Sequence, residues 1–134
     1  MPQEMDLKSI ESNLLGHGVE FAGFINRQGR VVDYGCKKEI SLSEEQKDMF
    51  FMATSLSLAM QRDYDDNFGQ VQYIVTEREE SRIVSIPIPS GAIVLVVSKD
   101  VGLEAIVEKI LMAVDLMRNR NVDLSGPQIW RSII

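Results

Sequence analysis

The spacing of apolar residues divides the first third of the chain into a helix and a hairpin. Leu7, Ile10 and Leu14 recur at helical spacing and predict a helix over Met5–Leu15, which the following "GHG" ends. Two short apolar runs then flank a turn at Gln28-Gly29. They predict an antiparallel pair made of Val19–Asn26 and Arg30–Tyr34.

A second helix begins at Ser43, where a capping-box spacing to Gln46 is followed by apolar residues as far as about Asp63. The polar segment "YDDNFG" is predicted to end that helix. Three strands should follow, at Gln70–Thr76, Arg82–Ile88 and Ala92–Ser98. The last of these is apolar throughout, which is typical of a central strand with both faces buried. An apolar stripe then predicts a closing helix from Asp100 to Met117.

The predicted order is α-β-β-α-β-β-β-α. Because tight turns join most of the strands, we expect a five-stranded, mainly antiparallel sheet. A central strand buried on both faces requires helices on both faces, so the expected fold class is an α/β (α+β) three-layer sandwich. Residues 1–118 would form this domain, and residues 119–134 a C-terminal tail with an apolar end.

Composition narrows the functional classes. The chain has 134 residues, 45% of them hydrophobic, and a net charge of −6. An acidic protein lacks the basic surface that nucleic-acid binding requires. No apolar run approaches the roughly 18 residues of a membrane helix, and the acidic N-terminus lacks a signal pattern. We therefore expect a cytoplasmic protein that neither binds nucleic acid nor inserts into a membrane.

The residues that could carry chemistry are few. His17 is the only histidine and Cys36 the only cysteine, so no internal disulfide, zinc site or triad with a second histidine can form. No phosphate-binding GxxxxGK[ST] segment occurs. The sequence thus predicts a non-enzymatic protein without catalytic residues, metal or cofactor. Two lysines beside Cys36 leave a redox or modification role open for this thiol.

The second helix carries apolar residues on two sides. One stripe is expected to face the sheet and consists of Met49, Met52, Ala53, Leu56 and Met60. Phe51 and Leu58 lie on the other side, seven residues apart, and predict a homodimer interface. The alternative is that both fold under a loop or the tail. The predicted interface comprises Phe51, Thr54, Ser55, Leu58 and Arg62 with Val71 and Tyr73 of the next strand.

The tail offers a second candidate surface. Its apolar residues are Ile129, Trp130, Ile133 and Ile134. Tryptophan is enriched among residues that dominate binding energy. The tail could grip a partner or dock on its own domain, and the sequence leaves both alternatives open.

Two segments resemble the Roadblock/LC7 family. "GVEFAGFINRQGRVVDYG" at Gly18–Gly35 is similar to its opening hairpin, although Asn26-Arg27 stands where aspartate is common. "GQVQYIVTEREESRIVSIPIPSGAIVLVVSKDVGLEAIVEKILMAV" at Gly69–Val114 is similar to its strand meander and closing helix. The resemblance covers about Met5 to Met117. It implies a non-enzymatic dimer, paired through the second helix and the strand after it, that serves small Ras-like GTPases or larger complexes as a scaffold or regulator.

Two functional hypotheses follow. The first is a homodimeric scaffold or regulatory protein that binds a partner protein, such as a small Ras-like GTPase or a larger protein complex. The second is a small-molecule sensor domain of PAS or profilin type. The expected core is aliphatic and methionine-rich with few convergent polar groups, which favours the first.

Overall fold

The computed structural model describes residues 18–102 together with residues 104, 108 and 111. Its elements are β1 (Val19–Asn26), β2 (Val31–Cys36), α2 (Glu44–Gln61), the 3₁₀ helix η1 (Arg62–Tyr64), α3 (Asp65–Phe68), β3 (Ile74–Glu77), β4 (Ser81–Ile88) and β5 (Gly91–Ser98). Of the predicted closing helix, Glu104, Glu108 and Leu111 are described, and all three are helical. The predicted helix over Met5–Leu15 and the tail lie outside the described residues.

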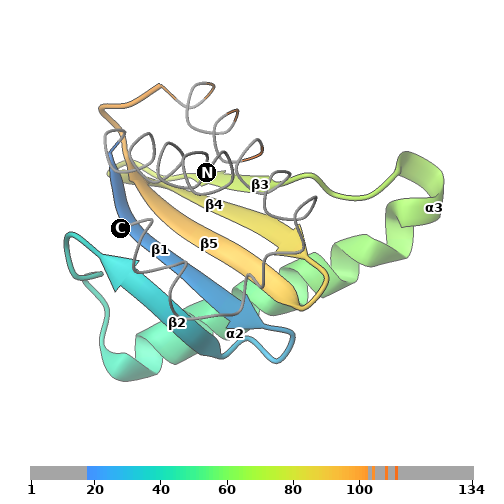
Figure 1. Ribbon diagram of the computed structural model, residues 1–134, viewed down its shortest axis with the longest axis horizontal. Coiled ribbons are helices and arrows are strands. Elements are labelled where there is room, and N and C mark those ends of the chain that lie inside the picture. Colours follow the sequence, from blue (N-terminus) through green and yellow to red (C-terminus); the bar gives the residue numbers. More distant parts are fainter. Residues whose placement is uncertain (1–17, 103, 105–107, 109–110, 112–134) are drawn as a thin grey trace, which may run out of the picture.

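The five strands form one sheet in the order β2-β1-β5-β4-β3, and every neighbouring pair is antiparallel. α2 lies across one face of this sheet (Figure 1). β5 occupies the centre, as its continuous apolar run predicts. Val94 and Leu95 are adjacent residues of β5 whose side chains point to opposite faces of the sheet. They are 0% and 2% exposed, so both faces of the central strand are buried.

The β1–β2 hairpin packs directly on α2. Gly29 has a φ of +80°, which favours glycine, and its N–H donates to the Asn26 carbonyl at 2.9 Å. The Asn26 side chain accepts from the backbone N–H groups of Gln28 and Arg30, both at 3.0 Å. A Cβ at Gly29 would lie 2.7 Å from the Met52 Cα. The turn therefore needs glycine for its conformation and for its close approach to the helix.

α2 begins where the sequence predicts and ends at Gln61, close to the predicted end near Asp63. Ser43 and Gln46 form the complete capping box, which satisfies backbone donors at the start of the helix. Beyond Gln61, helical turns continue through η1 and α3. They stop at Gly69, whose φ is +83°. The predicted end of α2 is therefore right to within two residues, but most of "YDDNFG" forms further helical turns where a loop was expected. α3 projects past the sheet as a result (Figure 1).

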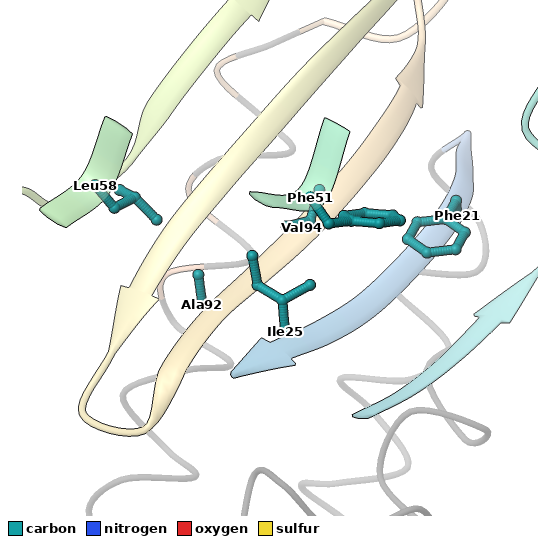
Figure 2. Close-up of a cluster of buried hydrophobic side chains, with 6 residues drawn as sticks. All are labelled: Phe21, Ile25, Phe51, Leu58, Ala92 and Val94. Carbon is teal, nitrogen blue, oxygen red and sulfur yellow. The ribbon is translucent and has the colours of Figure 1, made fainter. Parts of the chain in front are cut away.

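The side of α2 that faces the sheet is the reverse of the predicted one. Phe51 and Leu58 are each 3% exposed and lie in the core with Phe21, Ile25, Ala92 and Val94 (Figure 2). The four long apolar side chains that were expected to face the sheet are instead exposed, with fractions of 70%, 56%, 62% and 61% for Met49, Met52, Leu56 and Met60. Phe51 and Leu58 therefore cannot form a surface of the folded monomer.

Aromatic packing explains this orientation. The Phe51 ring stacks on Phe21 with centroids 5.8 Å apart, and Phe21 stacks on Tyr34 at 5.6 Å. Such ring pairs contribute roughly 0.5–1.5 kcal/mol beyond the area they bury. A helix with two apolar stripes turns its aromatic stripe to the sheet when the sheet presents aromatic partners, and Phe21 provides one.

β3 is shorter than the predicted strand Gln70–Thr76. Arg78 and Ser81 form a hydrogen-bonded backbone pair at the end of the β3–β4 ladder. Every second pair of an antiparallel ladder is hydrogen-bonded, so a residue opposite Gln72 would also have to donate its N–H. Pro87 occupies that position on β4, and proline has no N–H to donate. Regular pairing therefore stops at Ile74, which leaves Val71 and Tyr73 in the segment before the strand.

Candidate protein-interaction surface

The outward side of α2 carries an apolar surface, which we call the methionine stripe. It consists of Met49, Met52, Leu56 and Met60. Their spacing of three, four and four residues places them along one side of the helix, opposite Phe51 and Leu58. Contiguous exposed apolar side chains are typical of protein-binding sites. The sequence pattern predicted this stripe but placed it against the sheet, whereas the structure exposes it.

Two hydroxyl residues of the predicted interface are engaged within the protein. Thr54 Oγ1 donates to the Phe50 carbonyl at 2.9 Å, one helical turn back. Ser55 Oγ donates to the Arg27 carbonyl at 2.8 Å and so ties α2 to the β1–β2 hairpin. The Ser55 hydroxyl thus supports the packing of α2 on the hairpin, whereas the Thr54 hydrogen bond stays within the helix.

Other predicted interface residues meet at a hollow where β3 separates from β4. Leu58, Arg62 and Val71 line this hollow of about 470 Å³ together with Pro87 and Pro89. At its rim the Arg27 guanidinium donates to the Pro89 carbonyl at 2.7 and 3.0 Å. Tyr73, 40% exposed, lies in the segment that leads into β3. Of the predicted residues, Phe51 lies in the core, Leu58 lies in the core and at this hollow, and Arg62 and Val71 line the hollow.

A charged cluster fixes the end of β3. Glu77 accepts from Arg82 Nε at 2.7 Å and from the Lys99 ammonium. Arg82 Nη1 also donates to the Val101 carbonyl at 2.6 Å. The hydrogen bond from Lys99 and then that from Arg82 lower the pKa of Glu77 below its ordinary value. The cluster joins β3, β4 and the segment after β5, and its geometry is that of a structural ion-pair network.

Groups with catalytic potential are sparse in the part of the chain that the structure describes. Cys36 is a half-buried free thiol at the end of β2. Among residues 18–102, 104, 108 and 111, no three His, Cys, Asp or Glu side chains gather closely enough to hold a metal ion. No helix within the same residues has the length and apolarity to cross a membrane. His17 and the four apolar tail residues lie outside the described residues.

The sequence matches a family model described as "Family of unknown function (DUF6659)" over residues 3–122. The chain belongs to this family. A search of curated protein sequences found no match. Membership of this family therefore assigns no activity. The remaining comparison is between the fold of this chain and solved structures.

Solved structures of Roadblock type resemble this member of the family. A Roadblock/LC7 domain from Streptomyces avermitilis has a TM-score of 0.63 at 14% identity, covering 87% of this chain and 98% of that one. The gliding protein MglB from Thermus thermophilus has a TM-score of 0.65 at 16% identity, with coverages of 88% and 87%. "MglB with tetrameric arrangement" has a TM-score of 0.66 at 15% identity, with coverages of 100% and 93%. The chain therefore has the Roadblock/LC7 fold, which confirms the predicted resemblance.

Proposed function

We propose that this protein is a non-enzymatic, cytoplasmic homodimer that acts as a scaffold or regulator for a small Ras-like GTPase. The observation that carries the proposal is the methionine stripe on the outward side of α2. The GTPase, as partner, is what the Roadblock resemblance implies. Similarity to a solved structure titled "MglB with tetrameric arrangement" supports self-association.

The stripe supports a two-fold interface for a physical reason. Burial of apolar surface contributes about 25 cal/mol per Å², and more than half of each of its four side chains is exposed in the monomer. A two-fold interface brings the same surface of each copy together, so one stripe supplies both halves of the contact. Its spacing of three and four residues is also that of a helix–helix seam.

The edge of the sheet beside β3 supports the same arrangement. β3 is an outer strand, and within the described residues no strand pairs with its outer side. An unpaired edge presents free N–H and C=O groups that can pair with another chain. We propose that Val71 and Tyr73, just before β3, complete the interface at this edge. Phe51, Ser55 and Leu58 act beneath it, by holding α2 on the sheet and its hairpin.

A charge in the stripe tests the dimer. Leu56→Asp should convert the dimer to a monomer in light scattering, because a carboxylate would be buried without a partner. Gln61→Asp is the matched control, since it puts the same charge on an exposed position about 140° around the same helix and should leave the dimer intact. A monomeric wild-type protein at tens of micromolar, a range that captures moderately stable dimers, would overturn this part.

Capture from cells tests the partner. The wild-type protein, immobilised and incubated with extract of its source cells and a non-hydrolysable GTP analogue, should retain a small Ras-like GTPase that mass spectrometry identifies. Addition of the free protein should then change the rate at which that purified GTPase hydrolyses GTP. If no nucleotide-binding protein is retained, the GTPase role fails while the dimer remains separately tested.

The hollow beside β3 favours a second candidate function, binding of a small molecule. Its volume of about 470 Å³ falls within the range of ligand sites, and Arg27, Arg62 and Gln72 bring polar groups to it. Native mass spectrometry of protein purified from its source cells separates the two candidates. A retained small molecule, lost on Arg62→Ala, would favour the sensor.

A further inference from the structure

β2 forms the sheet edge opposite to β3. Its outer side pairs with no strand in the part of the chain that the structure describes. Val31, Val32 and Tyr34 are 37%, 49% and 54% exposed along it. An apolar strand with an open edge invites pairing with another chain, and natural proteins normally protect such edges with charges or bulges. β2 has a bulge at its start and one charged residue, Asp33, within it, and Tyr34, Gly35 and Cys36 after Asp33 are uncharged.

The hydrogen-bond pattern shows which β2 groups are available. Lys37 N–H donates to the Glu20 carbonyl at 2.9 Å, so this pair of residues is hydrogen-bonded. Antiparallel pairs alternate, which directs the backbone groups of Gly35 and Asp33 toward β1 and those of Tyr34 and Cys36 away from it. Two adjacent sites for an added strand therefore lie on the regular part of β2.

A hollow adjoins these two sites. The side chains of Tyr34 and Cys36 face α2 and line a space of about 170 Å³. Phe21, Phe51 and Ile40 form its apolar walls. A cavity of about 150 Å³ accommodates a benzene molecule, so the hollow has room for one apolar side chain.

The rim of the hollow is acidic. Glu39, Glu44 and Asp48 line it together with one base, Lys47, which lies 3.4 Å from Glu44 Oε1. The rim thus has more negative than positive groups. Complementary charge selects partners and speeds their encounter, and here it favours a segment with Lys or Arg residues.

We propose that the β2 edge binds an extended, basic segment of another protein as an added antiparallel strand. A residue opposite Tyr34 or Cys36 would place its side chain on the α2 face, where the hollow accepts an apolar group. Residues two positions away point to the same face, which brings Lys or Arg to the acidic rim. The proposal does not rest on the dimer, because β2 and β3 are opposite edges and no residue of the methionine stripe lines this hollow.

Amide hydrogen exchange of the full-length protein tests the proposal. The probe is the peptide acetyl-Thr-Lys-Thr-Leu-Thr-Lys-Thr-amide at about 1 mM, a concentration that detects weak complexes. The amides of Tyr34 and Cys36 should exchange quickly in the free protein and slow with peptide. Those of Asp33 and Gly35, already in the ladder, provide an internal control. The same peptide with Glu in place of Lys should leave all four unchanged.

Charge-reversal variants separate this site from nonspecific attraction to an acidic protein. Asp48→Lys should weaken binding about threefold to tenfold, since it replaces an attractive rim charge by a repulsive one. Glu45→Lys reverses an exposed charge on the same helix that does not line the hollow, and it should leave affinity unchanged.

Three results would overturn the proposal. The first is unchanged exchange of Tyr34 and Cys36 at the highest peptide concentration. The second is equal loss of affinity in the two variants. The third is concentration-dependent protection of these amides without peptide, which would assign the edge to a second copy of this chain.

Discussion

Leu56 and Leu58 are identical residues two positions apart on α2, and they have opposite environments. Leu58 is 3% exposed and packs in the core cluster, whereas Leu56 is 62% exposed on the methionine stripe. Leu58 therefore contributes to folding and Leu56 to surface properties. Both residues have the same helix propensity, so a difference between their variants reports which side of α2 is buried.

Truncation of each leucine should give very different stabilities. Leu58→Ala should lower the free energy of unfolding by about 2–5 kcal/mol, because it removes buried contacts and leaves a cavity. Leu56→Ala should change it by no more than about 0.5 kcal/mol. Urea denaturation at a low, fixed protein concentration, where association contributes least, measures both. A larger effect for Leu56 would contradict the orientation of α2.

At the scale of elements, β3 is a four-residue strand secured at its end by charge. Proline at position 87 limits its pairing with β4, and the cluster of Glu77, Arg82 and Lys99 holds the other end. Because the pKa of Glu77 is lower in the folded state, its stabilising effect is fully present above the unfolded value of 4.5. It is lost as the pH falls below 4.5 and passes through the lowered pKa.

Glu77→Gln should therefore alter the pH dependence of stability. At neutral pH the variant should have a lower melting temperature than the wild type, and the gap should close as the solution is acidified below pH 4.5. Thermal unfolding across a pH series measures it. The control is Glu79→Gln, in the same hairpin. Glu79 forms no ion pair among the described residues, so the melting temperature of this variant should follow that of the wild type at each pH. A constant gap at all pH values would show that Glu77 acts through packing.

At the scale of the molecule, the sheet has two outer strands with different surroundings. β3 lies next to the middle and later turns of α2, and β2 lies next to the first turns of that helix. The central strands β1, β5 and β4 separate the two edges (Figure 1). The proposed dimer contact and the proposed peptide site therefore lie at different edges of the sheet.

The two surfaces should act independently. Leu56→Asp should abolish the dimer and leave the exchange protection by the basic peptide unchanged, and saturating peptide should not alter the dimer mass. Sites that share no residues normally combine additively. Light scattering and hydrogen exchange on the same samples measure both. Loss of peptide binding in the monomeric variant would instead assign the β2 site to the dimer.

The sequence by itself determined the order of the strands along the chain and the position of the central strand. The run Ala92–Ser98 predicted β5 with both faces buried, and the turn at Gln28-Gly29 predicted the hairpin, since these signals are local and depend on residue type alone. The capping box at Ser43 likewise fixed the start of α2. The quoted segments also carried the Roadblock/LC7 resemblance.

Only the tertiary structure decided which side of α2 is buried and where β3 begins. The helix has two apolar stripes, and the choice between them depends on Phe21, which lies thirty residues before Phe51. The shortened β3 depends on Pro87, which occupies a donor position on another strand. Both are contacts between distant segments, which periodicity within one segment cannot reveal. For this reason the sequence predicted an interface at Phe51 and Leu58, whereas the structure exposes the methionine stripe on the opposite side of α2.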